Sequence, residues 1–147
     1  MLVRLTQTFA RRGYNIDSLV VSPAHNTAFS RITVVVQGEP STYNQILRQL
    51  NKLVDVVHAA SHESTDVVDR EMALFKVKVD PKKRAEIFQI VEVFRAKTVD
   101  ITDQSLVIET TGDSSKIDAL EKLLGPMGLS EMVRSGKLIM KRGIEET

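Results

Sequence analysis

The chain has 147 residues, of which 42% are hydrophobic and 27% are charged, proportions that allow an ordinary globular core. Its 20 basic and 19 acidic residues give a net charge of +1, which offers no sign of a polyanion-binding protein. Cysteine is absent, which excludes disulfides, thiolate metal sites and a cysteine nucleophile. No apolar run approaches the roughly 20 residues of a membrane span, and no signal-peptide pattern is present, so we expect a cytoplasmic protein.

The first half of the chain predicts the order helix, strand, strand, helix, strand. Leu2, Leu5 and Phe9 lie at helical spacing, and Gly13 follows them as a left-handed stop. Two β-rich runs separated by a turn-forming segment predict a hairpin. The expected elements are a helix over 1–12, strands over 16–21 and 31–36, a helix capped at Ser41 or Thr42, and a strand over Val54–Ala59.

The second half repeats this pattern after a polar stretch, 60–70, that we interpret as a linker. Phe75, Val77 and Val79 alternate with lysines, which predicts a strand with one solvated face. Asp80-Pro81 ends this strand and opens a helix. The remaining expected elements are strands over 97–101 and 106–110, a helix from about Ser114 to Gly125-Pro126, and a closing strand over 138–141.

The order of the second half is βαββαβ, the ferredoxin-like motif of four antiparallel strands with two helices on one face. The first half matches it except for the leading strand. We therefore predict an α+β protein of two tandem ferredoxin-like modules: an N-terminal domain over 1–62 that lacks its first strand, and a C-terminal domain over 71–147. Either a strand of about 6 residues is missing before Met1 or the first module has three strands. An incomplete sheet favours pairing with another chain.

Three motifs suggest chemistry but fit simpler roles better. His58 and His62 have the i, i+4 spacing of a metal-binding helix, yet they fall at a strand end and in the linker, where two imidazoles do not converge. Gly136-Lys137 lacks the upstream glycine of a phosphate-binding loop, so we interpret it as a turn. No carboxylate pair or nucleophile elbow suggests catalysis, and the strands lack the aromatic signature of RNA-binding sheets.

Asn15, in the segment Arg11–Leu19, has two possible roles. On residue type alone we favour a turn role, because Asn suits turns. Its amide also offers both a donor and an acceptor at the start of a strand, which is the equipment needed to hold an amino acid zwitterion.

At these residues the sequence resembles the small, regulatory subunit of acetohydroxyacid synthase, also called acetolactate synthase. The matching stretches span nearly the whole chain in the order and spacing of that family. They are Phe9–Leu19, Gln49–Val56, Arg70–Leu74, Phe94–Asp100 and Arg134–Lys137. The first and the fourth are the most specific.

The resemblance implies an N-terminal ACT domain that senses an amino acid and dimerises, followed by an ACT-like domain. It implies a chain without enzymatic activity or cofactors of its own. Members of this family bind and stimulate a large catalytic subunit that uses thiamine diphosphate, Mg²⁺ and FAD. That partner condenses two pyruvates, or pyruvate and 2-ketobutyrate, at the start of valine, leucine and isoleucine synthesis. Family members also confer feedback inhibition, typically by valine.

In this family two ACT domains pair side by side and hold the amino acid at their interface. One protomer contributes the loop before its first helix, which ends at a position that Leu2 matches, with Val3 beside it. The other contributes an Asn at the start of a strand, which Asn15 matches, with Ile16 beside it. The loop reads roughly Asn-x-x-Gly-(Val or Ala)-Leu, and Met1 falls at its Val-or-Ala position. The loop's Asn and Gly are therefore absent here, which should weaken the anchoring of the effector carboxylate.

We therefore predict a cytoplasmic (or plastid-type) homodimer that associates with the catalytic subunit and binds valine through Leu2, Val3, Asn15 and Ile16. Two alternatives stay open. One is an ACT-type amino-acid sensor that regulates a different enzyme or transcription. The other is an enzyme of ferredoxin-like fold.

Overall fold

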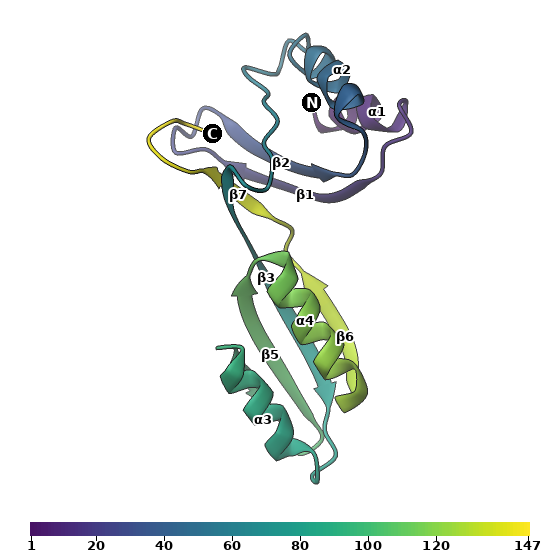
Figure 1. Ribbon diagram of the computed structural model, residues 1–147, viewed down its shortest axis with the longest axis vertical. Coiled ribbons are helices and arrows are strands. Elements are labelled where there is room, and N and C mark those ends of the chain that lie inside the picture. The colour runs from purple at the N-terminus through teal and green to yellow at the C-terminus, as the bar shows by residue number, and fades with distance from the viewer. The chain divides into compact units, whose positions relative to one another are not determined.

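The computed structural model describes all 147 residues, and the chain divides into two compact units (Figure 1). The first unit comprises Met1–Val68 and Ile139–Thr147, and the second unit comprises Asp69–Leu138. The C-terminal residues Ile139–Thr147 thus group with the first unit, whereas the domain expected over 71–147 includes them. None of the helices is both long enough and apolar enough to cross a membrane.

The first unit packs two helices against a two-stranded antiparallel sheet (Figure 1). Its elements are α1 (Leu2–Ala10), β1 (Ile16–Pro23), β2 (Ser30–Val36) and α2 (Pro40–Leu50). The helices are amphipathic and bury Leu5 and Phe9 from α1 and Ile46 and Leu50 from α2. The predicted order of helix, strand, strand, helix is confirmed.

The predicted start of α2 is wrong by a few residues. The N-cap of the helix is Glu39 and not Ser41 or Thr42. Pro40 occupies the first turn, because its fixed φ suits a helix start and its missing N–H removes no helical hydrogen bond.

The strand predicted over Val54–Ala59 is also wrong, because this segment is irregular. Asn51, the C-cap of α2, holds the far end of this irregular segment in place. The Asn51 side-chain amide donates to the Ala59 carbonyl at 3.1 Å and accepts the Ala59 N–H at 2.9 Å. Val54 and Val57 are 95% and 80% exposed. The β-branched residues therefore add little to the core, and a side chain binds the backbone groups of Ala59 that a sheet would use.

The second unit is a complete ferredoxin-like module. Its elements are β3 (Val67–Lys78), α3 (Arg84–Val93), β4 (Lys97–Ile101), β5 (Ser105–Gly112), α4 (Ser114–Leu124), a 3₁₀ turn (Gly125–Met127) and β6 (Leu129–Arg134). The strands form an antiparallel sheet in the order β4-β5-β3-β6. This order and the βαββαβ succession confirm the predicted fold class.

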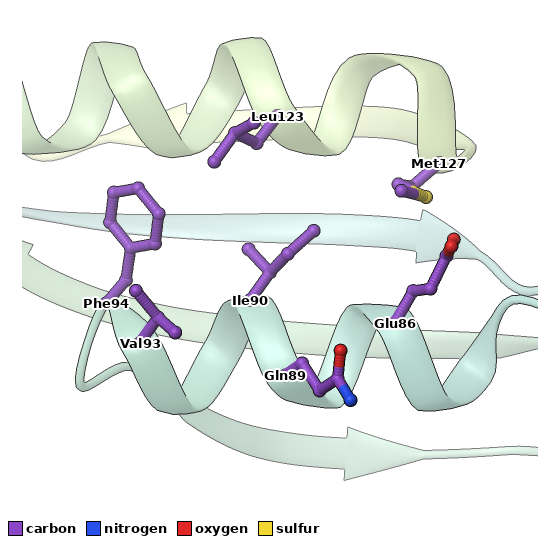
Figure 2. Close-up of a pocket in the computed structure, with 7 residues that line it drawn as sticks. All are labelled: Glu86, Gln89, Ile90, Val93, Phe94, Leu123 and Met127. Carbon is purple, nitrogen blue, oxygen red and sulfur yellow. The ribbon is translucent and has the colours of Figure 1, made fainter.

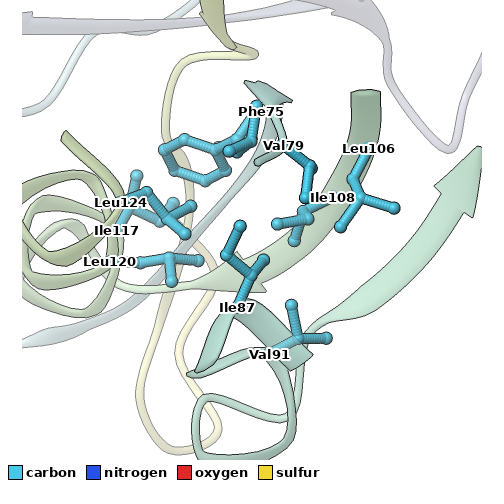
Figure 3. Close-up of a cluster of buried hydrophobic side chains, with 11 residues drawn as sticks. Phe75, Val79, Ile87, Val91, Leu106, Ile108, Ile117, Leu120 and Leu124 are labelled. Carbon is cyan, nitrogen blue, oxygen red and sulfur yellow. The ribbon is translucent and has the colours of Figure 1, made fainter. Parts of the chain in front are cut away.

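The core of the second unit lies between the two helices and one face of the sheet (Figure 3). In β3, Phe75 and Val77 are fully buried, whereas the lysines that alternate with them are exposed. Ile87 from α3, Ile108 from β5 and Leu120 from α4 meet them, each with no exposed area. The alternating strand and the apolar helix stripes predicted from the sequence are confirmed.

Two boundaries in the second unit differ from the predicted ones. β3 begins at Val67, inside the expected linker, because the buried alternation of the strand already starts at this residue, which is 4% exposed. The helix expected to open at Pro81 begins only at Arg84. Asp80 first forms a turn, in which its carboxylate accepts the Lys82 N–H at 3.1 Å.

The fourth strand of the sheet is β6, which was not predicted. The predicted closing strand forms as β7 (Leu138–Lys141), but it is an additional strand that pairs with β3. Polar Ser130 and Glu131 break the apolar alternation of β6, so periodicity alone does not reveal it. Gly128 precedes β6 with a φ of 102°, and a Cβ there would lie 2.3 Å from the Lys78 carbonyl oxygen, so only glycine fits.

Candidate functional site

The predicted effector residues Leu2 and Val3 begin α1. These residues are 43% and 67% exposed. The first hydrogen bond of the helix runs from the Leu5 N–H to the Met1 carbonyl at 3.1 Å, so the preceding N–H groups have no partner within the helix. No side chain caps them. The start of α1 thus combines exposed apolar side chains with N–H groups that can bind an anion.

A tightly built turn connects the other end of α1 to β1. Gly13 has a φ of 71°, which side-chain-bearing residues rarely adopt. The Tyr14 N–H donates to the Phe9 carbonyl at 3.1 Å. The ring of Tyr14 lies over Gly38, where a Cβ would come within 2.0 Å of the ring, and its centroid is 6.1 Å from that of Tyr43. These contacts fix the position of the residues that follow the turn.

Asn15 follows this turn with its side chain exposed, and Ile16 opens β1 half-buried. The Asn15 amide makes no hydrogen bond within the chain, and its φ is not positive. By contrast, the Asn26 side chain accepts the Ala28 N–H at 3.1 Å, as turn asparagines commonly do. The turn role favoured on residue type alone therefore has no support here, and the amide donors and acceptor of Asn15 stay available.

Within one chain the two groups of predicted site residues lie apart. Leu2 and Val3 begin α1, whereas Asn15 and Ile16 follow its other end. A helix of nine residues, Leu2–Ala10, spans about 13 Å along its axis. One copy of the chain thus does not bring all four residues into a single pocket.

The remaining sequence motifs show no assembled chemistry. No group of three or more His, Cys, Asp or Glu side chains is placed to hold a metal ion. His58 lies in the irregular segment after α2 and His62 in the segment that precedes β3. Gly136, with a φ of 90°, lies between β6 and β7, in agreement with its interpretation as a turn.

The sequence analysis missed a buried ion pair in the second unit. The Glu71 side chain is 4% exposed and pairs with the Arg134 guanidinium, whose Nε lies 3.1 Å from Glu71 Oε1. Ser114 also donates to this carboxylate at 3.3 Å, and Asp118 contacts the guanidinium. The hydrogen bond to Glu71 raises the pKa of Arg134 further above its already high value. The one sequence signal was that Glu71 falls on the core-facing side of β3.

An open, mostly apolar groove of about 400 Å³ runs between α3 and α4 (Figure 2). Ile90 of α3 and Phe94, which follows that helix, face Leu123 and Met127 across the groove, and Glu86 and Gln89 are its polar lining residues. Glu86 is the only titratable residue that lines the groove, and none of the predicted site residues lines it.

Two family models together match most of the chain. Residues 1–58 match the model described as the AHAS small subunit-like ACT domain, where AHAS stands for acetohydroxyacid synthase. Residues 70–143 match the model described as the small subunit of acetolactate synthase.

Individual relatives agree with the family models. The acetolactate synthase small subunit of Mycolicibacterium smegmatis is 43% identical over 143 residues, which cover 97% of this chain and 84% of that protein. The chloroplastic acetolactate synthase small subunit 1 of Nicotiana plumbaginifolia is 44% identical over 142 residues, 97% of this chain but 31% of that protein. The crystal structure of the acetolactate synthase small subunit from Thermotoga maritima matches with a TM-score of 0.88 at 38% identity, covering 98% of this chain and 90% of that chain.

Proposed function

Since the chain belongs to the family of acetolactate synthase small subunits, we propose that it binds the catalytic large subunit of that enzyme, raises its activity and makes it sensitive to valine. Thiamine diphosphate, Mg²⁺ and FAD then belong to the large subunit. The observation that carries the proposal is that the similarity covers both the ACT-type region and the C-terminal region, in one continuous chain.

The effector site lies between two copies of the N-terminal region in a homodimer. Leu2 and Val3 of one protomer face Asn15 and Ile16 of the partner subunit. The separation of these residues along α1 supports this arrangement, because a single chain holds them at opposite ends of the helix.

Each group of residues supplies a different part of the recognition. Backbone N–H groups at the start of α1 bind the effector carboxylate, which the helix dipole favours. The Asn15 amide accepts a hydrogen bond from the ammonium group. The exposed side chains of Leu2 and Val3, together with Ile16, contact the branched aliphatic side chain of valine.

Valine inhibits by favouring the less active of two states of the complex. It can do so only to the extent that it binds the two states with different affinities. Because such coupling is reciprocal, the catalytic subunit must change the affinity of this chain for valine by the same factor.

The activating role is tested by mixing the purified chain with the large subunit and measuring acetolactate formation. We expect co-elution of the two proteins and a rise in activity over the large subunit alone. The absence of both co-elution and a rise in activity would refute the proposal.

The site is tested by Asn15→Ala, with Asn44→Ala as the matched control, since Asn44 is an exposed asparagine of α2 that makes no side-chain hydrogen bond. Loss of one hydrogen bond to a charged ligand should weaken valine binding about tenfold. Valine inhibition should fall accordingly, while activation persists. Calorimetric titration with valine measures the first effect and the acetolactate assay the second. Equal valine affinity in both variants would remove Asn15 from the site.

A further inference from the structure

The two helices of the first unit carry only basic charged residues. Residues 1–16 and 40–54, which include both helices, contain no Asp or Glu, and the acidic residues that border these stretches are Asp17, Glu39 and Asp55. They hold five basic residues, all exposed, which we call the basic helix face: Arg4, Arg11, Arg12, Arg48 and Lys52. The rest of the chain holds the other 15 of the 20 basic residues and all 19 acidic ones. The net charge of +1 therefore conceals a strongly uneven distribution.

The helix geometry places three of these side chains, those of Arg4, Arg11 and Arg48, on the solvent side of the layer. Arg4 and Arg11, the C-cap of α1, are seven residues apart, about two helical turns, so they lie on one stripe. Arg48 lies midway between the buried residues Ile46 and Leu50, so it points away from the core. α1 and α2 contact each other and lie side by side in the first unit (Figure 1).

No residue of this face has an acidic partner in the chain. The ion pairs of the chain all lie between residues 69 and 145: Lys76–Glu131, Arg134–Glu71, Arg134–Asp118, Lys137–Asp69 and Lys141–Glu145. Arg12 donates to the neutral Gln45 side chain. Arg11 and Arg12 are adjacent in the chain, well within the screening length of about 8 Å at physiological salt, so they repel each other. A surface of this kind is stabilised when an acidic surface covers it.

We propose that the basic helix face is the surface through which the chain docks on an acidic region of the catalytic large subunit. This inference rests on the proposed function, which supplies the partner. The homodimer contact proposed above involves the start of α1 and the start of β1. A second copy is a poor occupant of the solvent side of the two helices, because a two-fold contact across Arg11 and Arg48 would bring like charges together. Single-stranded nucleic acid is a poor occupant too, because the face has no exposed aromatic side chain for base stacking: Tyr14 and Tyr43 are half-buried and pack against each other.

The test compares two double charge reversals in the full chain. R11E/R48E reverses two charges of the basic helix face. K82E/K122E is the matched control, since Lys82 and Lys122 are equally exposed, have no ion pair and lie in the second unit. Affinity for the large subunit is measured by calorimetry at low and at high salt.

R11E/R48E should bind the large subunit about 30-fold more weakly at low salt, with a smaller salt dependence than the unmodified chain. The affinity of the control should stay within about threefold of that of the unmodified chain. The charge-conserving R11K/R48K should bind nearly as well as the unmodified chain.

Two further measurements separate this inference from the proposed function. Valine binding by R11E/R48E alone, together with its circular dichroism, should match the unmodified chain, which shows that the variant is folded. If the unmodified chain does not bind the large subunit at all, the proposed function fails. If it binds, and R11E/R48E binds equally well or both double variants lose affinity equally, the docking surface lies elsewhere and the inference is overturned. Tight binding of a single-stranded oligonucleotide by the unmodified chain but not by R11E/R48E, with large-subunit affinity unchanged, would also overturn it in favour of a nucleic-acid partner.

Discussion

The two units of the chain use related elements but differ in how fully each builds a core. The second unit has a four-stranded sheet and 11 buried core residues, many with no exposed area. In the first unit a two-stranded sheet and two helices bury four residues: Leu5, Phe9, Ile46 and Leu50. A two-stranded hairpin is marginal by itself and gains stability from helices or from further strands. The unit with the proposed effector residues is therefore the one whose stability would depend more on the proposed pairing with a second copy.

This difference predicts unequal costs for the same substitution in the two units. Phe75→Ala should lower the free energy of unfolding of the second unit by about 4 kcal/mol, because a fully buried ring leaves a cavity in a closed core. Phe9→Ala should cost the first unit less, about 2 to 3 kcal/mol, because its smaller core can relax around the gap. Native-state hydrogen exchange measures the two units separately, through the amides of β5 and of β1. If either variant destabilised both units equally, the units would unfold together and the comparison would fail.

The buried ion pair sharpens the comparison, since the first unit has no counterpart. Arg134→Met would leave the Glu71 carboxylate buried with the Ser114 hydroxyl as its remaining partner. We expect a loss of about 2 kcal/mol, less than for a fully buried pair because the Arg134 side chain is 26% exposed. Folding raises the pKa of Arg134, so its contribution is lost only at pH values far above neutral, and the loss on substitution should be constant from about pH 6 to 9.

Urea denaturation of Arg134→Met and of the double variant Glu71→Gln/Arg134→Met measures this effect. The double variant should recover part of the lost stability, because it no longer buries an unpaired charge. A single variant as stable as the unmodified chain would show that the pair is only a surface contact.

The helices and strands that could be predicted are those in which buried apolar residues recur at regular spacing along the sequence. Phe75, Val77 and Val79 alternate with lysines, and the strand they predict is the central one of its sheet. The apolar pattern gave a wrong prediction where a side-chain hydrogen bond or the pairing of strands decides the local structure. The Asn51 side chain binds the backbone N–H and C=O groups of Ala59, which a sheet would otherwise use. The β-branched segment before Ala59 therefore stays irregular. The strand β6 could not be recognised from its apolar pattern, because Ser130 is polar. Pairing with β3, and not the pattern of its own residues, fixes the position of β6.

The candidate site could be placed only in part from the sequence. The segment around Asn15 carried a family resemblance, but residue type alone favoured a turn role, and only the structure shows that its amide makes no bond to the turn. The basic helix face was concealed for a different reason. Net charge sums over the whole chain, whereas a docking surface depends on which charges the fold brings together, such as Arg11 and Arg48 from two helices.

The smallest expected difference concerns the capping of single helices. The Asp113 carboxylate accepts the Lys116 N–H at 2.9 Å at the start of α4 in the second unit, whereas α3 of the same unit and both helices of the first unit have no side-chain cap. This bond, with the one from Ser115, lowers the pKa of Asp113 below its ordinary value of 3.8. A carboxylate with a lowered pKa stabilises the fold above its unfolded pKa and loses this effect as the pH falls through its folded pKa.

Asp113→Asn tests the cap, because Asn accepts the same hydrogen bond but does not titrate. The unmodified chain should therefore lose stability relative to Asp113→Asn as the pH falls below about 4. Near neutral pH the two should differ little. Urea denaturation from neutral to acidic pH measures the difference, and a constant offset over the whole range would mean that Asp113 does not stabilise α4 through its charge.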